Sequence, residues 1–121
     1  MRIGGEDRWI AVEDVGRYRD ALGAVSPPGV PDAFLGPTAQ PLASLLLRYA
    51  WVHALFLEAD PAMRWGLPEG AVTAELQTLA RAGSLLHGEF RPGGLDREWC
   101  DPEVLRSLRR RSLARLRKAV E

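Results

Sequence analysis

The fold is decided by the stretch Ser84-Leu85-Leu86-His87-Gly88-Glu89-Phe90-Arg91-Pro92-Gly93-Gly94-Leu95-Asp96-Arg97. Two short segments that favour β-strands lie on either side of Pro92-Gly93-Gly94: residues 85–90 before it and Glu98-Trp99-Cys100 after it. Because proline fixes the entry to a turn and glycine accepts positive φ angles, this pattern predicts a β-hairpin. A helical pattern ends at Gly83 and another begins at Asp101, so the hairpin is expected between two helices.

The segments before the hairpin predict a helix-turn-helix. Residues 41–53 begin with proline, which suits the first turn of a helix, and repeat apolar side chains at spacings of three and four. A short helix over 61–65 and a tight turn at Gly66-Leu67-Pro68 then lead into a helix over 69–82. The side chains of this last helix that are expected to face inward are Val72, Leu76 and Leu79.

Helix, helix, hairpin and helix is the layout of a winged helix, with the loop from Arg91 to Arg97 as the wing. Leu55-Phe56-Leu57 is expected to pair with the hairpin as a third strand. The predicted fold class is therefore mainly α with a small antiparallel β-sheet (α+β): a winged helix-turn-helix preceded by a short β/α arm.

Three parts are expected along the chain. Residues 1–23 form an amino-terminal arm, in which 1–7 are expected to be a disordered lead-in, 8–12 a strand, and the rest a short helix ending at Gly23. Residues 24–40 are a proline-rich connector, which proline keeps semi-extended. Residues 41–121 form the winged-helix domain with an arginine-rich carboxy-terminal helix.

Charge is balanced overall but unevenly distributed. The chain has 16 basic and 16 acidic side chains, yet eleven of the basic ones follow residue 60. A single cysteine, Cys100, excludes an internal disulfide and fits a reducing compartment. With no signal peptide and no apolar run near the ~18–20 residues that span a bilayer, the chain is expected to be cytoplasmic, with no membrane partner.

The clustered arginines are the candidate nucleic-acid contacts. The wing carries Arg91 and Arg97, and the last helix carries the run Arg109-Arg110-Arg111, which could neutralise phosphates. The presumed recognition helix over 69–82 offers Gln77 and Arg81, too little for sequence-specific base readout. The alternative is that the arginine-rich helix is a solvated face or docks on an acidic protein surface. The candidate binding residues are Gln77, Arg81, Arg91, Arg97, Arg109, Arg110 and Arg111.

Residues that could support catalysis or metal binding form no recognisable set. His53, His87 and Cys100 match no zinc spacing, and nothing pairs Cys100 with a base as a nucleophile would require. Core roles are preferred for Cys100 and for the three tryptophans Trp51, Trp65 and Trp99, stacking on a base being the alternative for the tryptophans. We therefore expect no catalytic residue, no metal and no cofactor.

The motif from Gly88 to Gly94, followed by Arg97-Glu98-Trp99-Cys100-Asp101-Pro102-Glu103 and Leu108-Arg109-Arg110-Arg111, resembles the carboxy-terminal region of Lhr-type (large helicase-related) bacterial ATP-dependent DNA helicases. Arg8-Trp9-Ile10-Ala11 and Arg64-Trp65-Gly66-Leu67-Pro68 are similar to that region too. The resemblance implies an array of winged-helix modules associated with DNA repair, with neighbouring helicase domains as partners. Such arrays also resemble those of certain winged-helix DNA glycosylases.

The helicase motor itself is not expected in this chain, because it has neither a Gly-x-x-x-x-Gly-Lys-Ser/Thr motif nor an acidic magnesium-binding box. The expected function is therefore a non-catalytic module, not an enzyme. It would bind DNA weakly and non-specifically, including single-stranded DNA, or would scaffold neighbouring domains. Two alternatives stay open: a protein–protein interaction module that uses the arginine-rich helix, and a fragment of a glycosylase-like assembly.

Overall fold

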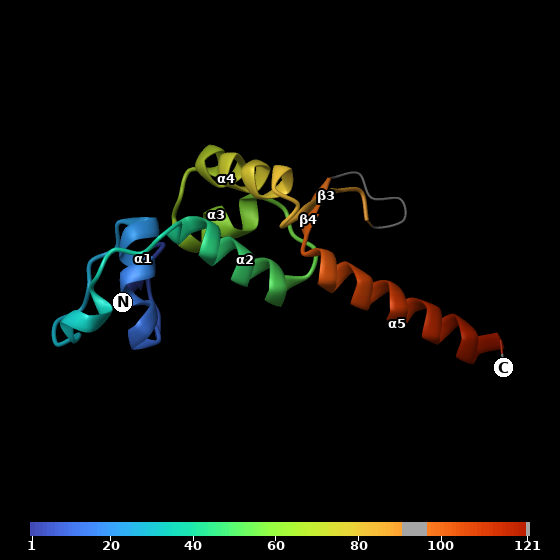
Figure 1. The fold of residues 1–121 in the computed structure, drawn as a ribbon, viewed down its shortest axis with the longest axis horizontal. Helices are drawn as coiled ribbons and strands as arrows, with labels where there is room; N and C mark the ends of the chain where they lie inside the picture. Colours follow the sequence, from blue (N-terminus) through green and yellow to red (C-terminus); the bar gives the residue numbers. More distant parts are fainter. Residues whose placement is uncertain (91–96, 121) are drawn as a thin grey trace.

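The structure is a computed structural model that describes residues 1–90 and 97–120, with the side chains of 114–120 left aside. Helices dominate, and two small antiparallel sheets of two strands each complete the described part, which confirms the predicted fold class (Figure 1). The elements, in chain order, are β1 (Arg2–Ile3), β2 (Glu6–Asp7), α1 (Val15–Leu22), α2 (Pro41–His53), α3 (Ala59–Trp65), α4 (Glu69–Arg81), β3 (Leu86–Gly88), β4 (Glu98–Cys100) and α5 (Pro102–Val120).

Helices α2, α3 and α4 pack together as the predicted helix-turn-helix. Proline occupies the first turn of α2, and α3 ends at Gly66 in the left-handed conformation, which glycine adopts without a steric penalty. The three side chains expected to point inward from α4 are buried, and α4 ends one residue earlier than predicted, at Arg81. The core that these helices enclose includes Leu45, Leu46, Ala50, Trp65, Val72, Leu76, Leu79 and Leu85.

The predicted hairpin is formed by β3 and β4, which pair Leu86 with Cys100 and His87 with Trp99. The third strand expected at 55–57 is reduced to a single bridge, in which the backbones of Phe56 and Trp99 exchange two hydrogen bonds of 3.1 and 2.8 Å. Trp99 also donates its indole N–H to Glu58 at 3.0 Å. The hairpin is thereby tied to the segment between α2 and α3. Of the wing predicted from Arg91 to Arg97, residues 91–96 lie outside the described residues.

The amino-terminal arm differs from the prediction. Residues 1–7, expected to be disordered, contain the β1–β2 hairpin, whereas 8–11 form no strand. The reason is packing: Ile3 is only 1% exposed and belongs to the same hydrophobic cluster as Trp65, which lies far along the sequence. Helix α1 and its left-handed end at Gly23 are as predicted.

Polar contacts hold the connector against α1. Arg19 donates to the carbonyl groups of Leu35 and Gly36 at 2.7 and 3.1 Å, and Asp20 accepts the backbone N–H of Thr38 at 2.9 Å. The connector therefore follows a defined path from α1 to α2, which pack along each other. The boundaries proposed at residues 23 and 40 remain predictions, because one hydrophobic cluster joins the arm to α2–α4.

The core role predicted for the tryptophans is correct for Trp65 and Trp99, which are buried, and wrong for Trp51, which is 62% exposed. Trp51 lies on the outer side of α2, since Ala50 and Leu46 occupy the side that faces the core.

Candidate nucleic-acid interface

Gln77 and Arg81 lie exposed on α4, the helix predicted to recognise DNA. Arg81 donates to the hydroxyl of Thr78 at 3.2 Å, and Thr78 in turn donates to the carbonyl of Ala74 at 3.1 Å. The Arg81 guanidinium is therefore held along its own helix. Because these contacts are solvent-exposed, they leave it able to reach a phosphate.

Arg97 lies exposed just before β4 and donates to the carbonyl of His87, on the opposite strand, at 3.1 Å. The imidazole of His87 stacks on Trp99 with ring centroids 3.8 Å apart. Burial lowers the pKa of His87 from its ordinary value, and the nearby charge of Arg97 lowers it further. The charge of Glu58 acts on the pKa of His87 in the opposite direction. Arg91 lies outside the described residues.

Helix α5 begins with the capping arrangement that its sequence predicts. The carboxylate of Asp101 accepts the backbone N–H groups of Glu103 and Val104 at 2.8 and 3.2 Å. Glu103 also forms an ion pair with Arg106, one turn along the helix. From this start α5 projects away from the other helices (Figure 1).

The run Arg109-Arg110-Arg111 is exposed, and within the described residues none of the three forms an ion pair. Successive residues of an α-helix are about 100° apart around the axis, so the three side chains leave α5 in different directions. Arg109 lines a groove together with Leu105 and Leu108, and the other two arginines are not among its lining residues.

The structure does not gather the candidate residues into one surface. Helices α4 and α5 lie on opposite sides of the β3–β4 hairpin, so Gln77 and Arg81 are separated from Arg109–Arg111 (Figure 1). Arg97 lies at the loop end of the hairpin, next to the pair Gly88–Glu98. The candidate residues are therefore divided between α4, where Arg81 is the one arginine, and α5, which carries the run Arg109-Arg110-Arg111.

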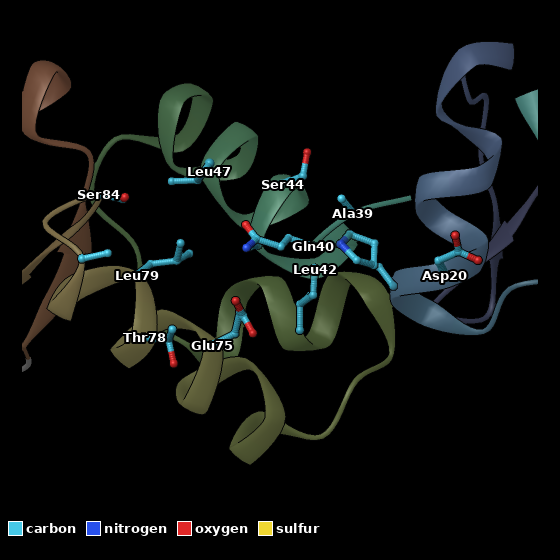
Figure 2. A pocket seen from close by; sticks show the side chains of 14 residues that line it. Asp20, Ala39, Gln40, Leu42, Ser44, Leu47, Glu75, Thr78, Leu79 and Ser84 are labelled. Atoms are coloured by element: carbon cyan, nitrogen blue, oxygen red, sulfur yellow. The ribbon is translucent and has the colours of Figure 1, made fainter. Parts of the chain in front are cut away.

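A cleft that was not predicted from the sequence lies where α1, the start of α2 and α4 meet, with a volume of about 560 Å³. Figure 2 shows Asp20 at one end, Glu75 and Thr78 on α4, and Leu42 and Leu47 on α2. Two carboxylates in its wall make this cleft a poor place for a phosphate. Its residues come from three distant segments, which is why no local pattern indicated it.

Side chains suited to catalysis are occupied in packing. His53 stacks on Tyr49, and His87 stacks on Trp99, each with ring centroids 3.8 Å apart. Cys100 is buried, and burial, followed by the charges of Asp101 and Glu98, raises the pKa of its thiol. Across residues 1–90 and 97–120, no group of three His, Cys, Asp or Glu side chains is arranged to hold a metal ion.

None of the described helices is both long and apolar enough to cross a membrane.

Comparison with known families finds similarity to helicase-related proteins. The model of the family described as large helicase-related protein, winged-helix domain, matches residues 1–37. These residues hold β1, β2 and α1, whereas the helix-turn-helix assignment of 41–121 depends on the order and packing of α2 to α5.

Two curated proteins match along nearly the whole chain. A Mycolicibacterium smegmatis protein named Lhr helicase/probable uracil glycosylase is 43% identical over 117 residues, which is 97% of this chain and 8% of that protein. An Escherichia coli protein named Lhr helicase/uracil glycosylase is 35% identical over 118 residues, 97% of this chain and 7% of that protein. The chain thus spans less than a tenth of the length of these relatives. The sequence of this chain is therefore similar to one part of the large helicase-related (Lhr) proteins, and its first 37 residues match the model of their winged-helix domain.

Proposed function

We propose that this chain is a non-catalytic winged-helix module that binds nucleic-acid backbones weakly, through the arginines of α5 with a contribution from Arg97. The observation that carries the proposal is the exposed run Arg109-Arg110-Arg111, which forms no ion pair with any described residue. A guanidinium without a protein carboxylate is available to a phosphate, which it can bind through two parallel hydrogen bonds.

Phosphate contact is favoured over base readout because of the composition of α4. Its exposed surface combines Glu69 and Gln77 with a single arginine, Arg81, and therefore has little net charge. Contacts to the backbone alone carry no sequence information, so binding should be largely independent of sequence and micromolar or weaker. The helicase and glycosylase names of the relatives agree with a role beside nucleic acid.

The test is a salt titration of fluorescein-labelled single- and double-stranded DNA by fluorescence anisotropy. Each neutralised phosphate adds about 0.9 to the slope of log K against log salt for duplex DNA. The triple variant Arg109→Ala, Arg110→Ala, Arg111→Ala should therefore reduce the slope by up to about 2.7. A single change, Arg110→Ala, should reduce it by about 0.9.

Two controls make the result specific. Arg64→Ala removes an exposed arginine from α3, far from α5, and should leave the slope unchanged. Gln77→Ala should also have almost no effect, which separates backbone binding from readout by α4. Unchanged binding by the triple variant would show that the arginines of α5 do not contact DNA. Absence of binding at low salt would instead favour the protein–protein alternative.

A further inference from the structure

An apolar groove runs between the body of the molecule and the first half of α5, with a volume of about 440 Å³. Leu55 and Phe90 form the wall on the body side. Leu55 follows the end of α2, and Phe90 follows the end of β3. The α5 side consists of leucines at helical spacing, and Leu113 is 54% exposed. The described residues that line the groove are Leu55, Phe90, Leu105, Leu108, Arg109, Ser112 and Leu113.

The groove has a defined chemical character. Its floor is aliphatic and aromatic, and among the described residues Arg109 is the one charged residue that lines it. Arg106 and Arg110 follow on the adjoining side of α5, and Arg106 is the one of these that pairs with a described carboxylate, Glu103. An occupant must therefore supply apolar side chains to the floor and a negative charge to the rim.

We propose that this groove receives an amphipathic α-helix of another protein domain, with an acidic residue of that helix against Arg109. A row of apolar side chains at i, i+3, i+4 and i+7 matches an apolar groove of this kind. Charge complementarity selects the acidic flank. A second copy of α5 fits poorly, because α5 carries six arginines and one lysine but a single carboxylate, Glu103, which pairs with Arg106.

This inference shares Arg109 with the proposed nucleic-acid binding. Arg110 and Arg111 do not line the groove, so Arg110→Ala should weaken DNA binding and leave peptide binding unchanged, which separates the two proposals. Nucleic acid is also an unsuitable occupant, because phosphates gain nothing from the leucine floor.

The probe for the test is a fluorescein-labelled 18-residue helical peptide with leucine at i, i+3, i+4 and i+7 and glutamate on both flanks. A second peptide carries lysine in place of every glutamate. At low salt the acidic peptide should bind at least tenfold more tightly than the basic one. In Arg109→Glu this preference should weaken or reverse, a result that a merely structural role for Arg109 would not produce.

A pair of matched variants locates the contact. Leu113→Glu and Val52→Glu each place a carboxylate at an exposed aliphatic position, Val52 being 75% exposed on α2 and outside the groove. Both should keep the circular dichroism spectrum of the parent chain. Leu113→Glu should weaken binding of the acidic peptide at least tenfold, whereas Val52→Glu should leave that binding unchanged. Equal binding of the two peptides, or equal effects of the two variants, would overturn the proposal.

Discussion

The β1–β2 hairpin packs on the end of α3, where Gly4 closely approaches Gly66 and the carbonyl group of Arg64. This contact can be tested directly. Gly4 has φ +58°, and a Cβ atom added there would lie 2.4 Å from the carbonyl oxygen of Arg64. Gly5, the next residue, has φ +82°, and a Cβ atom there would meet nothing within 4 Å. The two positions share the backbone conformation and differ in their contact.

Replacing each glycine by alanine separates backbone strain from collision. Gly5→Ala should lower the free energy of unfolding by about 1–2 kcal/mol, the cost of a left-handed conformation with a Cβ atom. Gly4→Ala incurs that cost and also forces the hairpin off α3, since the atom it meets belongs to the backbone. Undocking exposes Ile3, whose burial is worth about 1.5–3 kcal/mol, so the total for Gly4→Ala should be roughly 2.5–5 kcal/mol.

The measurement is urea unfolding followed by far-UV circular dichroism, with both variants compared with the parent chain. The midpoint should fall further for Gly4→Ala than for Gly5→Ala. Equal losses in the two variants would show that the contact between Gly4 and Arg64 is not formed, and would refute the packing of β1–β2 on α3 described above.

Other predictions concern the hairpin and the start of α5. Asp101→Ala should destabilise the chain by about 1 kcal/mol in urea unfolding, because two backbone N–H groups lose their acceptor; a loss within error would contradict the cap. Arg97→Ala should raise the pKa of His87 in an NMR titration, since a nearby positive charge is removed. Folding lowers the pKa of His87, so the unfolded state binds a proton at a higher pH than the folded state does. The free energy of unfolding should therefore fall as the pH drops through about 6.5, and His87→Phe should reduce that fall. Cys100, whose pKa is raised by burial, should react slowly with iodoacetamide at pH 8 and rapidly in urea.

The elements that could be predicted from the sequence are those with local signals. Proline at the start of α2, glycine after α1 and α3, and the Asp101 cap each act within one turn of a helix. The two strands around Pro92-Gly93-Gly94 were predictable for the same reason. The order of these elements was enough to indicate the fold class.

The errors arose where distant residues decide the outcome. Residues 1–7 contain little that favours order by itself, and the hairpin they form depends on Ile3 meeting a core built around Trp65. Trp51 is of a residue type that is often buried. Leu46 and Ala50 occupy the side of α2 that faces the core, so Trp51 lies on the exposed side. The groove beside Arg109 depends on the angle between α5 and the hairpin, which no local pattern specifies.

Because α5 projects from the other helices, a small rotation about its first turn produces a large displacement of its far end. At 1.5 Å per residue its 19 residues extend about 28 Å, so a swing of 10° about its first turn would displace the far end by about 5 Å. The direction of the helix is fixed at its root, where Leu105 is buried and Asp101 caps the first turn. A change too small to disturb the core at Leu105 can therefore displace the far end of the helix by more than a hydrogen-bond length, and so change which surface it reaches.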